Sequence, residues 1–176
     1  LLDNLQLTSN WENLQLCEAV IEAAPESLDL KQSIFASLEK VVSDTCLLAT
    51  NTSTLAVTEL AGDLTHPERF GGMHFFNPAP VLPLVEVIKA AQTSESTAQS
   101  LHALAIQLGK TPVNTLDTPG FIVNRVARPY YGEALRMLSE RIASFAQIDS
   151  ILTESGGFRM GPYRLMDLIG IDINFK

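Results

Sequence analysis

The chain has 176 residues, of which 46% are hydrophobic, and a formal net charge of −8 at pH 7. This length predicts one ordinary domain, or one domain with a small appendage, and the apolar fraction excludes a wholly disordered chain. The negative charge argues against a nucleic-acid-binding surface, because such a surface must neutralise phosphates. The two cysteines, Cys17 and Cys46, stand in unrelated contexts, so we expect neither a disulfide framework nor a metal site.

No apolar run in the sequence is long enough to cross a membrane, and no basic segment followed by an apolar one forms a leader. We therefore expect a cytoplasmic protein that makes no membrane contact. The chain begins at Leu1 rather than at methionine, and helix-like sequence precedes its first apolar run. The sequence is therefore expected to be an excerpt of a longer protein.

The first part of the chain alternates short apolar runs with segments in which apolar residues recur at helical spacing. Such apolar runs are typical of buried strands, and the predicted strands are residues 20–24, 46–50, 70–76, 84–88 and 111–115. Helical spacing predicts helices at residues 13–19, 27–41, 55–61 and 94–108, with Ser27 as the cap of the second. The alternation of strand and helix predicts a layered α/β sheet domain.

The pattern changes at residues 117–120 (DTPG), after which only helical spacing is visible. A first helix follows residue 121, a second is predicted at 144–151, and Gly161-Pro162 opens a third. We therefore expect one domain over residues 1–117 and the beginning of a mostly α-helical domain over residues 118–176.

The stretch 72–80 (GMHFFNPAP) places His74 beside two aromatic residues and ahead of closely spaced prolines. Glu86 stands inside the apolar run 84–88, where a buried carboxylate is costly unless it has a partner. If the proline-rich segment doubles the chain back, Glu86 reaches one imidazole nitrogen and leaves the other facing a cleft. Such a pair is an oriented general base. The alternative is a satisfied core histidine and a strand-edge glutamate that points to water.

Polar residues also stand where a sheet domain places its ligands. Asn51 and Ser53 follow an apolar strand at its carboxyl end, where open α/β sheets bind ligands. The alternative for Ser53 is a helix cap, and Asn77 before Pro78 is often a simple turn former.

Three further polar residues have two interpretations each. Asn124 stands early in the first helix of the second domain, where it faces either a crevice or solvent. Glu26 and Lys31, after the first buried strand, either approach a cofactor or form a surface pair of little energetic weight.

Taken together and in order, six segments resemble the L-3-hydroxyacyl-CoA dehydrogenase family, which includes 3-hydroxybutyryl-CoA dehydrogenases. The resemblance extends over most of the chain, and the segments are VIEA at 20–23, TNTS at 50–53, GMHFFNP at 72–78, LVEVI at 84–88, DTPGFIVNR at 117–125, and MGP at 160–162 continued by DLIGID at 167–172.

The resemblance implies a fold and an activity. Residues 1–117 would be the C-terminal part of an NAD-binding, Rossmann-type domain, and the fold class would be an incomplete α/β sheet domain followed by a helical one. Residues 118–176 would begin the helical domain that binds substrate and forms a homodimer. The enzyme would interconvert L-3-hydroxyacyl-CoA and 3-ketoacyl-CoA with NAD as cofactor, in fatty-acid oxidation or a related pathway.

The resemblance also implies roles for individual residues. His74 would be the general base for the 3-hydroxyl proton, and Glu86 would orient it. Ser53 and Asn124 would hold the substrate oxygen, and Asn77 would help to shape the substrate site. The residues implied for NAD are Ala23, Glu26, Lys31, Asn51 and Ser53.

The sequence departs from the family at two points. The glycine-rich fingerprint for dinucleotides is absent and would lie before Leu1. Leu82-Pro83 stands where members often carry methionine and a basic residue, which bears on the shape of the acyl pocket. Three alternatives remain: a relative acting on a non-CoA hydroxy acid, a structural, lens-crystallin-like homologue, and an inactive excerpt that serves as an oligomerising or acyl-binding piece.

Overall fold

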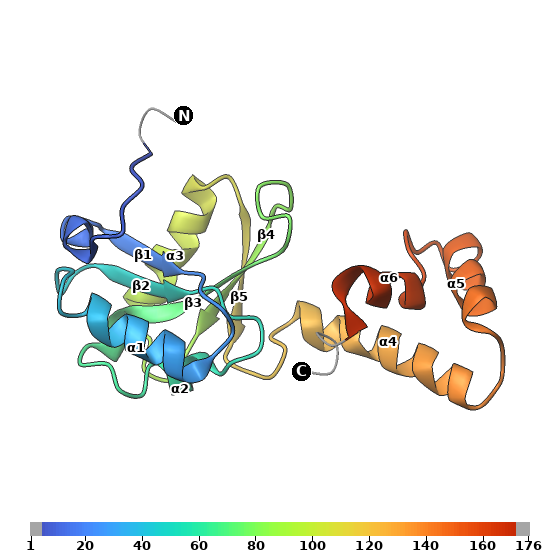
Figure 1. The fold of residues 1–176 in the computed structure, drawn as a ribbon. Helices are drawn as coiled ribbons and strands as arrows, with labels where there is room; N and C mark the ends of the chain where they lie inside the picture. Colours follow the sequence, from blue (N-terminus) through green and yellow to red (C-terminus); the bar gives the residue numbers. More distant parts are fainter. Residues whose placement is uncertain (1–4, 172–176) are drawn as a thin grey trace. The chain divides into compact units, whose positions relative to one another are not determined.

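The computed structural model describes residues 5–171. The chain divides into two compact units, Leu1–Phe121 (unit 1) and Ile122–Lys176 (unit 2). Unit 1 is a sheet with helices on both faces and unit 2 is helical (Figure 1), which is the fold class that the sequence predicts. The division falls a few residues after the position expected from the sequence, because Phe121 is buried in the core of unit 1.

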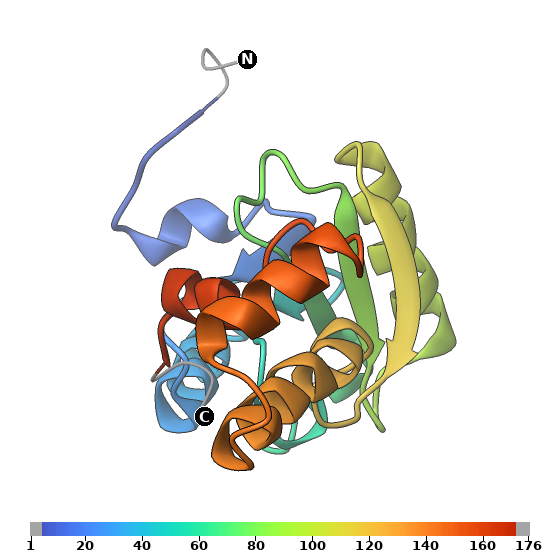
Figure 2. The same cartoon turned by 90° about the vertical axis from the view of Figure 1, so that its right-hand side faces the viewer.

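The sheet of unit 1 has five strands that follow one another across the sheet in chain order. They are β1 (Ala19–Glu22), β2 (Leu47–Thr50), β3 (Phe70–Phe75), β4 (Leu84–Lys89) and β5 (Thr111–Leu116). The first three are parallel, while β4 runs antiparallel to β3 and parallel to β5. The carboxyl ends of β1, β2 and β3 therefore share one end of the sheet. At the side away from β1, β5 is the outermost strand (Figure 2).

Helices cover the two faces of the sheet (Figure 1). One face carries α1 (Leu28–Leu38) and α2 (Val57–Leu60), and the other carries α3 (Glu95–Gln107). Neighbouring strand residues such as Leu48 and Ala49 belong to different core clusters, since successive side chains of a strand point to opposite faces.

Two glycines in β3 allow close packing on both faces of the sheet. A Cβ atom on Gly71 would lie 2.7 Å from Cδ1 of Leu101 in α3, and one on Gly72 would lie 2.8 Å from Cβ of Ile88. Glycine inside a strand commonly marks such a close approach. The close approach at Gly71 allows α3 to pack directly against the centre of the sheet.

The helix boundaries follow local capping chemistry. Ser27 caps α1 as the sequence predicts, since its side chain accepts a hydrogen bond from the Leu30 N–H. The helix predicted over residues 13–19 is instead a short 3-10 helix, Trp11–Leu14 (η2), and Ala19 already belongs to β1. A second 3-10 turn, Pro67–Arg69 (η3), leads into β3 and has no counterpart in the sequence prediction.

Unit 2 consists of α4 (Val123–Ser139), α5 (Phe145–Glu154) and α6 (Pro162–Ile169). Ser144 starts α5 with a capping box, and Asp149 accepts hydrogen bonds from the N–H groups of Tyr163 and Arg164 at the start of α6. A pocket of about 400 Å³ lies between α4 and α6, and its wall is mostly apolar.

Within residues 5–171, none of the helices combines the length and the hydropathy that a transmembrane span requires. Over the same residues, no group of three histidine, cysteine or acidic side chains is arranged to hold a metal ion.

Candidate active site

His74 and Glu86 are direct partners in the antiparallel pairing of β3 with β4. Their side chains lie on the same face of the sheet, and Nδ1 of His74 lies 2.7 Å from Oε2 of Glu86. Only 3% of His74 and 1% of Glu86 is exposed, so this contact compensates for the burial of two polar groups. The proline-rich segment does double the chain back, as expected from the sequence.

The Ser53 hydroxyl lies within hydrogen-bond distance of the second ring nitrogen of His74. Its Oγ is 3.1 Å from Nε2 of His74, so the ring is held between a carboxylate and a hydroxyl. The interpretation of Ser53 as a helix cap is wrong, because α2 begins at Val57 with Ala56 as its N-cap and without a side-chain capping bond. The hydroxyl faces the histidine instead.

Aromatic rings surround the imidazole of His74. The ring centroid of Phe76 lies 4.5 Å from that of His74, and the centroid of Phe121 lies 5.7 Å away. Phe121 is 4% exposed and has a positive φ of 46°. Local sequence patterns do not indicate that Phe121 contacts His74, because the two residues are distant in the chain.

Glu26 holds the loop that carries Ser53. Its Oε1 accepts hydrogen bonds from the Ser53 N–H at 2.9 Å and from the Thr54 N–H at 2.8 Å. It also accepts from the hydroxyls of Thr52 at 2.6 Å and Thr54 at 2.9 Å. Burial would raise the pKa of Glu26, but these four bonds hold the pKa below its ordinary value.

Lys31 is fully buried, at 0% exposed. Its Nζ lies 2.7 Å and 3.0 Å from the two carboxylate oxygens of Glu22, 3.0 Å from the Ala24 carbonyl oxygen, and 3.7 Å from Oε2 of Glu26. Thr50 donates a further hydrogen bond to Glu22 at 2.7 Å. The interpretation of Glu26 and Lys31 as a surface pair is therefore wrong, because Lys31 belongs to a buried network.

Asn51 and Asn77 lie in different surroundings. The side-chain oxygen of Asn51 accepts a hydrogen bond from the Phe75 N–H at 2.9 Å, which ties the end of β2 to the end of β3. Asn77 is exposed and precedes Pro78 through a cis peptide bond. Asn51 is therefore held beside the end of β3, and Asn77 lies three residues after His74 in the chain.

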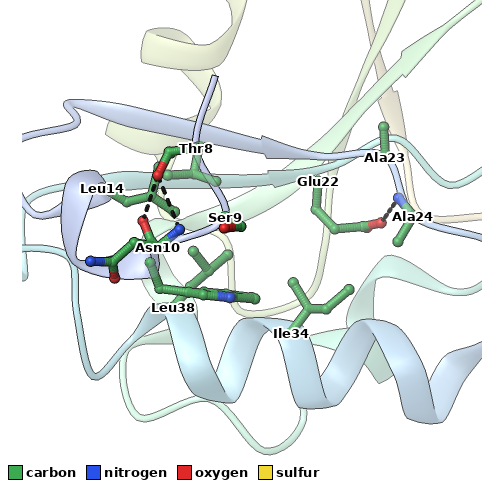
Figure 3. Close-up of a pocket in the computed structure, with 11 residues that line it drawn as sticks. Thr8, Ser9, Asn10, Leu14, Glu22, Ala23, Ala24, Ile34 and Leu38 are labelled. Atoms are coloured by element: carbon green, nitrogen blue, oxygen red, sulfur yellow. Dashed lines mark hydrogen bonds between the residues drawn. The ribbon is translucent and has the colours of Figure 1, made fainter. Parts of the chain in front are cut away.

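A pocket of about 360 Å³ lies along β1 and α1, where residues 8–11 also contribute to its wall. Figure 3 shows Glu22 at the end of β1, with a carboxylate oxygen that accepts a hydrogen bond from the Ala24 N–H. Ala23 lines this pocket and is exposed.

Asn124 lies in the first turn of α4, in unit 2, and is half-buried. The structure therefore brings together His74, Glu86, Ser53 and Glu26 within unit 1, and Asn124 belongs to the other unit.

Four residues support this site without being expected in it from the sequence: Glu22, Thr50, Thr52 and Thr54. Glu22 carried a usable signal, because a carboxylate in the apolar run 20–24 needs a partner for the reason that applies to Glu86.

Comparisons with known proteins agree with the resemblance. Residues 1–118 match the family described as 3-hydroxyacyl-CoA dehydrogenase, NAD binding domain. Residues 120–176 match the family described as 3-hydroxyacyl-CoA dehydrogenase, C-terminal domain. The match to an NAD-binding domain confirms NAD as the cofactor expected for this family.

Named relatives point the same way. The chain is 49% identical over 162 residues to 3-hydroxyadipyl-CoA dehydrogenase of Escherichia coli K12, covering 92% of this chain and 34% of that protein. It is 44% identical over 155 residues to human mitochondrial hydroxyacyl-coenzyme A dehydrogenase, covering 88% of this chain and 49% of the human protein. The chain thus spans about a third to a half of these relatives.

A crystal structure of 3-hydroxybutyryl-CoA dehydrogenase from Escherichia coli K12 superposes with a TM-score of 0.92 at 48% identity, over 96% of this chain and 36% of that one. Both units of the chain match one family, in the order that its members share. The chain therefore belongs to the 3-hydroxyacyl-CoA dehydrogenase family of NAD-dependent oxidoreductases.

Proposed function

We propose that this protein interconverts an L-3-hydroxyacyl-CoA and the 3-ketoacyl-CoA, with His74 as the general base and Glu86 as the residue that orients it. The observation that carries the proposal is the buried imidazole held at 2.7 Å from a carboxylate and at 3.1 Å from a hydroxyl. Oxidation of a secondary alcohol requires a proton acceptor beside the carbon that loses hydride, and imidazole suits this task near neutral pH.

The hydrogen bonds of the His74 ring indicate which of its two nitrogens accepts the substrate proton. An ionised Glu86 can only accept a hydrogen bond, so Nδ1 of His74 carries the hydrogen and Nε2 is the basic atom. Ser53 lies at Nε2, so a substrate hydroxyl held there passes its proton to Nε2 as C3 loses hydride and the carbonyl forms. In the reverse direction Nε2 returns the proton to the oxygen. NAD, when bound, supplies the hydride acceptor.

The residues present fit a dinucleotide at the carboxyl ends of β1 and β2. The pocket along β1 has small side chains at Ala23 and Ala24 in its wall, and open α/β sheets bind ligands at this end. We propose that Ala23, Glu26, Asn51 and Ser53 lie beside NAD, as the family resemblance implies. Lys31 would act with them through its contacts with Glu22 and Glu26.

The substrate is proposed from the relatives, whose names refer to acyl-CoA thioesters. In this proposal residues 118–176 belong to the domain that binds substrate and forms a homodimer, with Asn124 and Asn77 as substrate-binding residues. The cytoplasmic setting expected from the sequence stays a prediction.

The His74→Gln variant of the full-length protein tests the base. Loss of a general base lowers the rate by about 10²- to 10⁴-fold, so we expect kcat to fall in that range while the NADH dissociation constant is retained. His102→Gln is the matched control, because His102 contacts Asn114 of β5 rather than Glu86 or Ser53. An unchanged kcat in His74→Gln, measured with both variants folded, contradicts the assignment.

A substrate panel separates the remaining functions. L-3-hydroxyacyl-CoA esters of several chain lengths and the matching free hydroxy acids are compared by kcat/KM. Preference for the free acids contradicts the CoA proposal. Absence of turnover with all substrates, together with retained NADH binding, indicates the structural, lens-crystallin-like alternative. Absence of both indicates an oligomerising or acyl-binding piece.

A further inference from the structure

Glu26 contacts the loop that carries Ser53, whose hydroxyl lies beside His74. The four hydrogen bonds to its Oε1 come from three consecutive residues, Thr52, Ser53 and Thr54. One of them is the backbone N–H of Ser53. The carboxylate therefore fixes the backbone of the residue whose hydroxyl meets His74.

The carboxylate is itself anchored on the other side. Its Oε2 lies 3.7 Å from Nζ of Lys31, and Lys31 is held by Glu22 and the Ala24 carbonyl. A continuous path of contacts therefore runs from the end of β1 through Lys31 and Glu26 to the loop after β2. On this path Glu22 is the last residue of β1 and Lys31 lies in α1, so both anchors of Glu26 belong to regular elements.

The anchor depends on charge. An ionised carboxylate accepts hydrogen bonds only, and bonds to an ionised acceptor are about twice as strong as neutral ones. The lowered pKa of Glu26, which the four bonds produce against the effect of burial, keeps it ionised near neutral pH.

We propose that Glu26 is a positioning residue for catalysis, which holds the loop of residues 52–54 so that the Ser53 hydroxyl meets Nε2 of His74. This inference rests on the proposed function, since it assigns Glu26 a part in the proton-transfer geometry in addition to the cofactor contact implied by the family resemblance. A displacement of about 1 Å at a reacting group costs on the order of 10²-fold in rate, so a released loop lowers kcat.

Two substitutions at Glu26 in the full-length protein give different expected results. Glu26→Ala removes the acceptor for all four bonds, so we expect kcat to fall by about 10- to 100-fold. Glu26→Gln keeps a side-chain carbonyl that can accept from the Ser53 and Thr54 N–H groups, so it recovers part of the loss. In both variants the NADH dissociation constant changes by a smaller factor than kcat.

The double variant with Ser53→Ala supplies the decisive readout. If Glu26 acts through the Ser53 hydroxyl, Glu26→Ala lowers kcat strongly in the parent protein and only slightly in the Ser53→Ala background, because residues of one network are not additive. Thr54→Val removes one hydroxyl donor without changing Glu26. Thr54→Val is expected to lower kcat less than Glu26→Ala does. It replaces Glu26→Ala as the test variant if Glu26→Ala does not fold.

Glu39→Ala is the matched control. Glu39 also accepts hydrogen bonds from two backbone N–H groups of a distant loop, Thr65 at 2.8 Å and His66 at 3.0 Å. It lies at the opposite end of α1 from Glu26. This variant is expected to lose stability and keep kcat.

Two results overturn the positioning role while leaving the proposed function intact. One is a Glu26→Ala variant that raises KM for NAD with kcat unchanged, which assigns the carboxylate to the cofactor alone. The other is an effect of Glu26→Ala on kcat that is equally large with and without the Ser53 hydroxyl. If Ser53→Ala and His74→Gln both leave kcat unchanged, the proposed function fails and the positioning role fails with it.

Discussion

His74 and Glu86 face each other across two antiparallel strands, and this placement makes their contact rigid. Directly opposed residues of an antiparallel pair have Cβ atoms about 4.5–5.5 Å apart, so two side chains of this size meet without bending the backbone. The rings of Phe76 and Phe121 lie beside the imidazole, with centroids 4.5 Å and 5.7 Å from that of His74. The imidazole therefore has little freedom to leave the carboxylate.

Glu86→Gln is predicted to lower kcat while the protein stays folded. A hydrogen bond to a charged group is worth about 1.5–3 kcal/mol, and about 1.4 kcal/mol corresponds to a tenfold change in rate. The expected loss is therefore about 10- to 100-fold, smaller than for His74→Gln. The measurement is kcat and KM for acyl-CoA and NAD, with the thermal midpoint recorded.

The control for this prediction is Glu95→Gln, which removes an exposed carboxylate paired with Lys89. Parent-like kcat in Glu86→Gln, or an equal loss in both variants, contradicts the orienting role of Glu86.

Lys31 illustrates what sequence reasoning at single positions misses. A lysine in an amphipathic helix is usually placed at the surface, because burial of an ammonium is costly. Here the cost is offset by Glu22, which reaches Lys31 from the end of β1, nine residues earlier in the chain. A pairing between a strand end and a helix becomes visible only when α1 is packed on the sheet.

At the scale of elements, Asp117 connects α2 to the end of β5. Its two carboxylate oxygens accept hydrogen bonds from the N–H groups of Val57 at 3.0 Å and Thr58 at 2.7 Å. The first N–H groups of a helix lack partners inside the helix, and Ala56 provides no side-chain cap for them. A residue 60 positions later in the chain therefore performs the capping role.

Asp117→Ala is predicted to destabilise the protein by about 0.5–2 kcal/mol, the usual range for loss of a helix cap. Asp117→Asn is expected to lose less, because one amide oxygen still accepts a hydrogen bond. The free energy of unfolding in urea measures both. Asp63→Ala changes an exposed aspartate of the same unit and is expected to leave stability close to that of the parent. Equal stability of Asp117→Ala and Asp63→Ala contradicts the capping role.

Five strands and most helices could be predicted from local pattern, because buried strands and amphipathic helices have distinct hydrophobic periods. The register of β3 with β4 could not be predicted in this way. The hydrophobic period of a strand indicates which of its residues are buried, but it does not indicate which residues of the partner strand lie opposite them. His74 and Glu86 were paired by the physical requirement that a buried carboxylate has a partner. The family resemblance implies a cofactor role for Glu26, but its bonds to residues 52–54 depend on how the chain before α1 packs beside the loop after β2.

At the scale of the whole molecule, a carboxylate at each end of α1 accepts hydrogen bonds from a loop that is distant in the chain. Glu26 ties the chain before α1 to the loop after β2, and Glu39 at the end of α1 ties it to residues 65–66. Burial would raise the pKa of Glu39, but bonds from the Thr65 and His66 N–H groups and the charge of Arg69 lower it. Both carboxylates therefore favour the folded state only while they are ionised.

Acid unfolding is predicted to follow from these two groups. A carboxylate whose pKa is lower in the folded than in the unfolded state contributes stability that is present above its unfolded value and lost as the pH falls through its folded value. For Glu26 and Glu39 the reference value is 4.5, so stability is expected to decline from about pH 4.5 downward.

Net charge modifies this expectation without reversing it. The chain carries −8 at pH 7 and has an isoelectric point near 4.8, so self-repulsion weakens as the pH falls toward 4.8. Between pH 7 and 5 this change favours folding, and the carboxylates stay ionised. Below about pH 4.8 the chain becomes net positive, and below about pH 4.5 Glu26 and Glu39 lose their stabilising charge, so both effects destabilise the folded protein.

Urea unfolding at a series of pH values between 7 and 3.5, in the parent and in a Glu26→Gln, Glu39→Gln double variant, measures the contribution. The parent should lose stability more steeply below pH 4.5 than the variant, because the variant lacks the two groups that take up protons on unfolding. The difference should persist at high salt, since hydrogen-bonded, partly buried groups are screened less than surface charges. Parallel curves for the two proteins would assign acid unfolding to general charge repulsion instead.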